Sequence, residues 1–208
     1  MSHNMTAVSN LCQRAILLDM GDVIFDGDIQ SGVRKYLSNV DRDFFGEDIH
    51  LKINNLPEDP VLKLLDFYID QPGHPSSSFL SDQDISVTII YTVHQPVNGL
   101  RVGFDLILQE SGSVVFRSFF DDAESSKRET RPGTYISIGI IPANLLTAKT
   151  YIVSLSIGIH NIRWIVYEQV ASPLIVVNIG GVNSNYADVR PGMIMPQIQW
   201  TTLDRVES

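Results

Sequence analysis

Residues 150–160, TYIVSLSIGIH, alternate between large apolar and small side chains, and this predicts a β-strand with two unlike faces. Five large apolar side chains share one face, which we expect to lie in the core: Tyr151, Val153, Leu155, Ile157 and Ile159. The opposite face presents Ile152, Ser154, Ser156, Gly158 and His160, and it is almost free of bulk because of its serines and glycine. Gly and Ser are poor strand formers, so they indicate close approach by a ligand or a partner strand, unless the face is simply a small, solvated one.

The same alternation recurs through residues 61–179 and predicts an all-β fold. Strand patterns, with polar or Gly- and Pro-containing turns between them, cover residues 61–69, 85–93, 100–109, 114–120, 135–141, 162–167 and 174–179. In the strand 135–141 we expect Ile136, Ile138 and Ile140 to point into the core. Short strands separated by turns favour a β-sandwich of the immunoglobulin-like or jelly-roll kind.

The residues before the sandwich predict a short α/β segment followed by a linker. In residues 1–37 a helix, a hairpin and a second helix are expected, with Asp28 as the N-cap of the second helix. Residues 38–60 contain scattered acidic residues, glycine and proline, which interrupt any periodicity. We therefore expect a linker there, whose apolar residues 49–53 dock or form a short edge strand, and a sandwich domain at residues 61–208.

Composition narrows the classes of partner. The net charge is −9 without any run of Lys and Arg, which argues against nucleic acid and against an anionic membrane surface. The apolar runs are far shorter than the ~20 residues of a membrane-spanning helix. The single cysteine, Cys12, cannot form a disulfide within the chain. The sequence therefore predicts a cytoplasmic protein.

The N-terminal segment SHNMTAVSNLCQRAILLDMGDVIFDGDIQSGVRKYL, residues 2–37, resembles the closing segment of an ABC-transporter ATPase domain. In that family a Ser-His switch loop is followed by a helix, an A-I-x-L-D-x-G strand, a strand ending in D-G-D and a helix ending in Y-L. The resemblance implies that His3 occupies the position of the switch histidine, which contacts the γ-phosphate of the nucleotide.

Other parts of the ATPase motif set are missing from the chain. There is no G-x-x-x-x-G-K-[ST] phosphate loop, no LSGGQ-type signature and no apolar run that ends in Asp-Glu. Without a phosphate-binding loop and a carboxylate that binds Mg²⁺, the chain has no nucleotide site that His3 could contact. We therefore interpret residues 1–37 as the C-terminal remnant of an ABC ATPase domain, and we expect no enzymatic activity and no cofactor.

A second set of motifs runs through the predicted sandwich. Phe79 precedes an I-x-V-x-I-x-Y strand at 85–91, a G-x-x-V-F turn lies at 112–116, and residues 190–200 read R-P-G-x-I-x-P-x-I-x-W. A G-T-Y-type strand is matched loosely by residues 149–157. In this order, residues 61–200 are similar to the C-terminal domain of Wzt-type proteins, the ATPase subunits of O-antigen exporters.

The Wzt resemblance implies what the chain binds. In that family the domain binds the exported polysaccharide and forms a homodimer with exchanged C-terminal strands. It follows that the partners here are an O-antigen-type glycan of lipopolysaccharide, a second copy of the chain and the membrane subunit of an ABC transporter. We then expect a cytoplasmic protein held at the inner membrane through the transporter. In the alternative function, the sandwich only dimerises the transporter ATPase and binds no glycan.

Sugars are bound by aromatic faces together with short polar side chains and backbone groups, so the small-residue face is the candidate site. The candidate glycan-binding residues are Tyr135, Ser137, Gly139, Ser154, Ser156, Gly158, His160, Arg163, Trp164 and Tyr167. The prediction places the strands 135–141 and 150–160 side by side. Trp164 has two interpretations, since it either stacks on a sugar ring or fills the sandwich core.

Metal binding and hydrolysis are not expected. His74 and His94 lie in predicted loops away from Cys or acidic clusters. Asp121, Asp122 and Glu124 indicate a solvated acidic loop rather than a calcium site. No Ser-His-Asp set or carboxylate pair is suggested by spacing.

Overall fold

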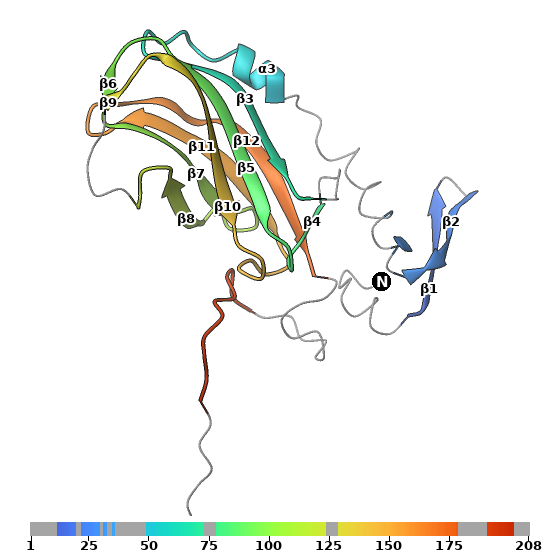
Figure 1. Cartoon of the computed structure of the whole chain (residues 1–208). Coiled ribbons are helices and arrows are strands. Elements are labelled where there is room, and N and C mark those ends of the chain that lie inside the picture. The colour runs from blue at the N-terminus through green and yellow to red at the C-terminus, as the bar shows by residue number, and fades with distance from the viewer. Residues whose placement is uncertain are drawn as a thin grey trace, which may run out of the picture.

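The computed structural model describes residues 12–19, 22–29, 31–32, 35, 49–72, 78–123, 129–178 and 191–201. Its elements are one labelled helix and twelve strands (Figure 1). They are β1 (Arg14–Asp19), β2 (Asp22–Asp28), α3 (Ile49–Asn54), β3 (Leu62–Asp70), β4 (Ser78–Leu80), β5 (Ile85–Val93), β6 (Val97–Asn98), β7 (Leu100–Leu108), β8 (Val114–Phe119), β9 (Glu129–Thr130), β10 (Gly133–Ile141), β11 (Thr150–Ile159) and β12 (Arg163–Val177). None of the described helices is long and apolar enough to span a membrane.

Two sheets face each other and form the predicted β-sandwich (Figure 1). One sheet has the strand order β10-β5-β3, and the other has the order β4-β12-β11-β7-β8. Neighbouring strands are antiparallel, apart from the parallel pair β12 and β4. The short strands β6 and β9 pair beside this framework. The all-β sandwich class predicted by the sequence is therefore confirmed.

Alternation along β11, β5 and β7 builds the core between the sheets. On β11 the predicted core residues Tyr151, Val153, Leu155 and Ile157 are fully buried. On β5 and β7 the predicted inward sets are also buried: Ile85, Val87, Ile89, Tyr91, Val93, Leu100, Val102, Phe104, Leu106 and Leu108. The large apolar side chains of these three strands meet in one cluster, which explains why their period of two appears so clearly in the sequence.

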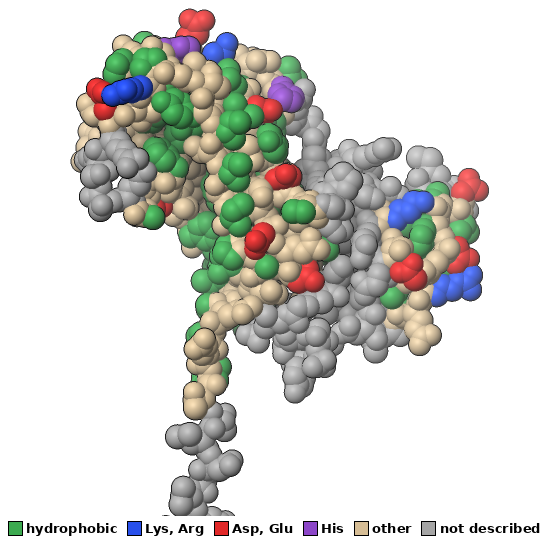
Figure 2. All heavy atoms as spheres, in the orientation of Figure 1, with side chains coloured by type: hydrophobic (Ala, Val, Ile, Leu, Met, Phe, Trp, Pro, Cys, Tyr) green, Lys and Arg blue, Asp and Glu red, His purple; other side chains and the backbone are tan. Residues whose placement is uncertain are grey.

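The prediction for β10 was wrong, because the strand is turned over. Ile136, Ile138 and Ile140 are 64%, 60% and 53% exposed and form a row on the outside of the three-stranded sheet, which we name the isoleucine face. Hydrophobic side chains run down this side of the molecule in Figure 2. The inward positions are filled by Tyr135, which stacks on Tyr91, and by Gly139, which leaves room for Phe104. Side-chain volume available inside the sandwich, rather than hydrophobicity, decides the orientation of this strand.

The linker and the last strands differ in detail from the prediction. Residues 49–54 form the helix α3 instead of an edge strand, and Ile53 docks into the core. The two strands expected at 162–167 and 174–179 are one strand, β12, which passes through an irregular stretch where Glu168 has a φ of 65°. Near the N-terminus, β1 and β2 form the predicted hairpin, and Asp28 accepts a hydrogen bond from the Ser31 amide as an N-cap does. His3 lies outside the described residues.

Residues 191–201 leave the sandwich as an extended segment that contains no β-strand. Met195 is buried and donates its amide to the carbonyl of Leu145, and Ile194 forms a single bridge with Leu146. Beyond this anchor, Ile198 and Trp200 are 65% and 87% exposed. Pro196 lacks an amide donor, which is consistent with the absence of a continuous ladder at this point.

Candidate functional site

The small residues of β11 lie at the centre of the side of the five-stranded sheet that points away from the core, which we name the outer face. Strand register places them in three rows across β12, β11, β7 and β8. The rows are Trp164, Gly158 and Arg101, then Tyr167, Ser156, Gly103 and Phe119, and finally Ala171, Ser154, Asp105 and Arg117. The strand register therefore brings aromatic and charged side chains to both sides of a centre made of Gly and Ser.

Aromatic rings lie over this small-residue centre. The Trp164 indole packs on Gly158, where an added Cβ would come within 2.8 Å of the ring. Trp164 and Tyr167 are nearly parallel with ring centroids 4.9 Å apart, and the centroid of the Phe119 ring lies 6.5 Å from that of Trp164. Trp164 remains 46% exposed, so the interpretation of Trp164 as a core residue was wrong. An exposed indole next to two further rings is available to stack on a ligand.

A buried carboxylate organises the polar part of the outer face. Asp105 is 2% exposed and accepts two hydrogen bonds from Arg117, through Nε and through Nη2 at 2.7 Å. The Ser156 hydroxyl donates to the second carboxylate oxygen at 3.2 Å. Hydrogen bonding to Asp105 raises the pKa of Arg117 above its ordinary value, although partial burial opposes this. Arg117 is thus held beside Trp164 and Tyr167, with its guanidinium carbon 5.5 and 5.6 Å from the two ring centroids.

A second arginine, Arg101, lies beside the Phe119 ring of the outer face. Arg101 lies over the Phe119 ring at 3.9 Å and donates to Asp121 at 3.1 Å and to Asp122 at 2.6 Å. Asp122 also accepts the Phe119 amide at 2.7 Å. The two aspartates that the sequence indicated as a solvated acidic loop are therefore partners of an arginine at the outer face.

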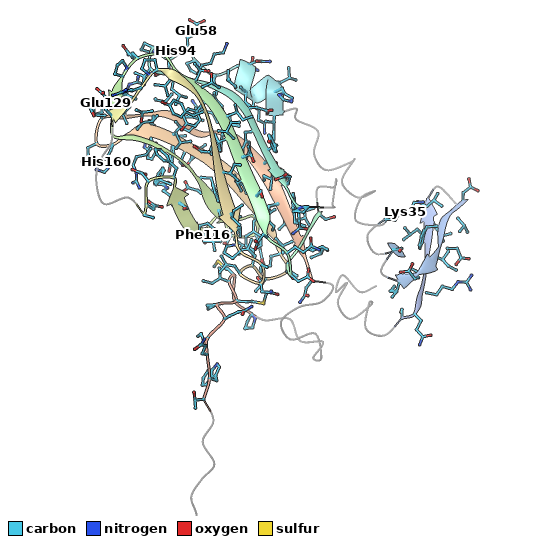
Figure 3. The ribbon with its side chains drawn as sticks, in the orientation of Figure 1. Lys35, Glu58, His94, Phe116, Glu129 and His160 are labelled. Atoms are coloured by element: carbon cyan, nitrogen blue, oxygen red, sulfur yellow. The ribbon has the colours of Figure 1, made fainter. Side chains whose placement is uncertain are left out.

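Four of the predicted residues line a single hollow of about 470 Å³ at the turn between β11 and β12. These four are Gly158, His160, Arg163 and Trp164. The neighbouring strands β7 and β8 add Arg101, Arg117 and Phe119 to the lining. Figure 3 shows His160 at this turn, at the end of the sandwich that also carries Glu129. Ser156 and Tyr167 join the hollow indirectly through their contacts with Asp105 and Arg117. Ser154 and Ser156 are themselves 3% and 0% exposed.

The remaining three predicted residues, Tyr135, Ser137 and Gly139, do not belong to this face. They lie on β10, which is in the other sheet, so the expected juxtaposition of β10 and β11 was wrong. Ser137 faces inward and lies 3.2 Å from the Tyr91 hydroxyl, with which it shares a hydrogen bond. The chain crosses from one sheet to the other between β10 and β11, which spacing along the sequence does not reveal.

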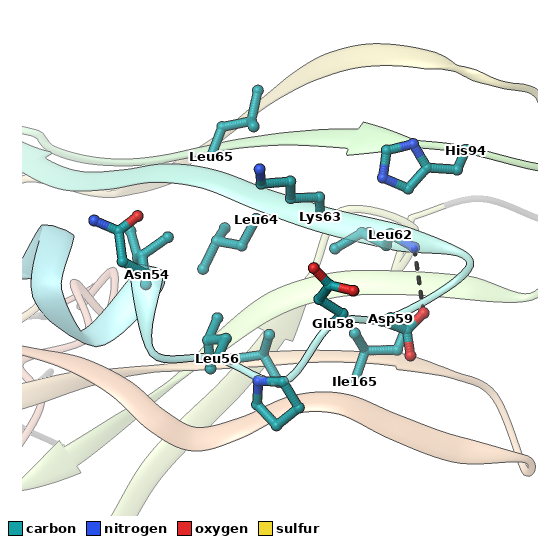
Figure 4. A pocket seen from close by; sticks show the side chains of 13 residues that line it. Asn54, Leu56, Glu58, Asp59, Leu62, Lys63, Leu64, Leu65, His94 and Ile165 are labelled. Carbon is teal, nitrogen blue, oxygen red and sulfur yellow. Dashed lines mark hydrogen bonds between the residues drawn. The ribbon is translucent and has the colours of Figure 1, made fainter.

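Arg163 holds the linker to the sandwich. Its guanidinium donates to the Asp59 carboxylate, which also accepts the amides of Val61 at 2.8 Å and Leu62 at 3.3 Å. Burial alone would raise the pKa of Asp59, but these hydrogen bonds outweigh it and hold the pKa below its ordinary value. Beside this contact a second hollow, of about 520 Å³, lies between α3, β3 and β12 and is lined by Lys63, His94, Ile165 and others (Figure 4). Its lining contains no Trp, Tyr or Phe ring for a sugar to stack on.

Residues of β7 and β8 were missed by the sequence analysis. Arg101, Gly103 and Asp105 alternate with the buried Val102, Phe104 and Leu106, and Arg117 and Phe119 alternate in the same way on the next strand. The signal is therefore polar residues in the outward register of two neighbouring strands. Within the described residues, no group of three or more His, Cys, Asp and Glu side chains is arranged to hold a metal ion.

Comparisons with known proteins agree with the fold. The structure is similar to the crystal structure of the C-terminal domain of Wzt, with a TM-score of 0.53 and 14% identity over 76% of this chain and 99% of that chain. A Niemann-Pick type C2 protein from the Japanese carpenter ant aligns with a TM-score of 0.38 and 13% identity over 57% of this chain and 95% of that chain, which is too low to indicate a shared fold. No protein-family model matches the chain, and no curated protein matches its sequence.

The two arginines of the outer face are expected to differ in their contribution to stability. Arg117→Ala leaves the buried Asp105 carboxylate without its ionic partner, so the free energy of unfolding should fall by about 3 kcal/mol or more. Arg101→Ala is the matched control, because its aspartate partners are 27% and 45% exposed, and it should cost about 1 kcal/mol or less. Urea unfolding measures both values, and equal losses would contradict the assignment of a buried pair.

Proposed function

We propose that this chain recognises a cell-surface polysaccharide of the O-antigen type, without catalysis, for export by an ABC transporter. The observation that carries the proposal is the exposed Trp164, which packs on Gly158 of β11 beside Tyr167 and Phe119. The fold shared with the C-terminal domain of Wzt supports it. The ATPase-like motifs near the N-terminus support the transporter context.

The outer face has the two kinds of group that a sugar requires. The apolar side of a pyranose ring can stack on the exposed indole, which is amphipathic and rigid. Sugar hydroxyls both donate and accept hydrogen bonds. Here Arg101 and Arg117 line the hollow as N–H donors, and the carboxylate of Asp122, which is paired with Arg101, is 45% exposed. Because each such bond replaces one with water, the affinity per site should be modest, and repeats along a polymer would raise avidity.

In this proposal the chain itself does not hydrolyse ATP, since no phosphate loop is present in its sequence. Its place is cytoplasmic and at the inner membrane, through the membrane subunit of the transporter. The role of residues 1–37 as a remnant of an ATPase domain belongs to the same proposal.

The proposed assembly is a homodimer in which each copy contributes its C-terminal segment to the other. Ile198 and Trp200 extend from the sandwich with 65% and 87% of their surface exposed, which is unfavourable unless a partner covers them. The strand β10 offers an acceptor, because in the described part of the chain it pairs only with β5, and its nine residues include no charge, proline or bulge. The isoleucine face beside it also favours the alternative function, a dimerisation module that binds no glycan.

Replacing the exposed indole should abolish recognition without unfolding the domain. Trp164→Ala is expected to weaken binding at least tenfold, a loss of about 1.4 kcal/mol, while the unfolding free energy falls by less than about 2 kcal/mol because the ring is partly exposed. The measurement is calorimetric titration with a polysaccharide selected on an array of purified O-polysaccharides. Tyr68→Ala is the control, since Tyr68 is an exposed ring on the other sheet. Unchanged binding by Trp164→Ala would refute the site.

Removing residues 196–208 should convert the dimer to a monomer, because the exposed Ile198 and Trp200 are lost. Ile138→Asp on the acceptor strand should do the same by placing a charge on the isoleucine face. Light scattering at micromolar concentration measures the mass, and Ile162→Asp, at an exposed turn, serves as the control. A monomeric parent chain, or a dimer that survives both changes, would contradict this assembly.

A further inference from the structure

We infer that the outer face selects uncharged glycans and rejects polysaccharides that carry carboxylate or phosphate groups. This inference rests on the proposed function and names the chemical class of its ligand. The inference follows from the arginines around Trp164, because each of them is paired with an aspartate.

Each arginine that lines the hollow, among the residues the structure describes, is already bound to a carboxylate. Arg117 is held by Asp105, Arg101 by Asp121 and Asp122, and Arg163 by Asp59. Three arginines therefore meet four aspartates, and no described arginine here is left to neutralise an anionic sugar. A face made to bind a sugar acid normally keeps a guanidinium fork open for its carboxylate or phosphate.

An anionic ligand cannot easily take over one of these arginines. To take Arg117 from Asp105, whose side chain is 3% exposed, it would have to leave that buried carboxylate unpaired. The N–H groups that Arg117 has left belong to a guanidinium whose charge Asp105 already neutralises. To reach Arg101 it must approach Asp121 and Asp122, which repel it. The chain as a whole carries a net charge of −9, which adds long-range repulsion against a polyanion.

The same pairs suit neutral hydroxyl groups. A guanidinium that is hydrogen-bonded to an aspartate still has N–H groups to donate to a sugar hydroxyl, since Arg has five of them. Asp122 is 45% exposed and offers a carboxylate oxygen as an acceptor at the rim. The rim therefore has a donor and an acceptor close together, next to the apolar ring of Trp164, as one face of a neutral sugar requires.

The test compares neutral and acidic polysaccharides on the full chain. An array of bacterial O-polysaccharides should give its strongest signals with members that lack uronate and phosphate. Calorimetry with the strongest binder should show less than a threefold change in affinity between 50 and 500 mM NaCl, because no ion pair forms with the ligand. Carboxymethylation of that polymer should weaken binding at least tenfold, while hydroxyethylation to the same extent, the size-matched control, should not.

A variant links the selectivity to the paired charges. Asp122→Asn removes one acidic partner of Arg101, so it should bind the carboxymethylated polymer at least threefold more tightly than the parent chain does. Preference for acidic polymers, with affinity that falls steeply as salt rises, would overturn this inference and leave the proposed function standing. Failure to bind any polysaccharide on the array would instead overturn the proposed function, and this inference with it.

Discussion

The lack of side-chain bulk on one face of β11 is the constraint on which the outer face depends. Gly158 allows the Trp164 indole to lie against the sheet, and a Cβ at Gly103 would come within 2.8 Å of the Phe119 side chain. Ser156 is small enough to fit beneath its neighbours and donates to Asp105. Larger residues at these positions would lift the rings and separate Asp105 from Arg117. The Trp164 ring and the Asp105–Arg117 pair can therefore pack over β11 because the side chains of β11 on that face are small.

The two sheets of the sandwich present opposite chemistry to solvent. The outer face of the five-stranded sheet has aromatic rings and arginine–aspartate pairs, which suit a polar ligand with one apolar side. The isoleucine face of the three-stranded sheet is apolar and borders an unpaired strand edge, which suits another chain. The proposed recognition and the proposed assembly thus use different sheets, and a substitution on one face should leave the other intact.

Much of the fold was predictable from the sequence because apolar residues alternate cleanly where only one side of a strand packs into the apolar core between the two sheets. This holds for β11, whose core face from Tyr151 to Ile157 is fully buried as expected. The pattern failed on β10, because Tyr135 and Gly139 fit the interior better than its isoleucines do. The local sequence of β10 does not reveal which of its faces points inward. The volume available to its inward side chains is set by Tyr91 and Phe104, which come from other strands.

The candidate site was predictable only in part, for a similar reason. Gly158, Arg163 and Trp164 are close in sequence and flank one turn, so the pattern brought them together correctly. Asp105 and Arg117 come from β7 and β8, and only the register of the five-stranded sheet places them beside β11. Ser137 was assigned to the same face because adjacent strands in sequence were assumed to be adjacent in space, whereas β10 and β11 lie in different sheets.

The most direct test of glycan recognition at the outer face is an NMR titration of the isotope-labelled chain with an oligosaccharide of the bound polymer. The account predicts that the indole N–H resonance of Trp164 shifts, together with backbone amides near Gly158, Gly103 and Phe119. The amides of β10 and those lining the hollow beside Lys63 should stay unchanged. Shifts confined to β10 or to that hollow, with the Trp164 resonance unmoved, would contradict it.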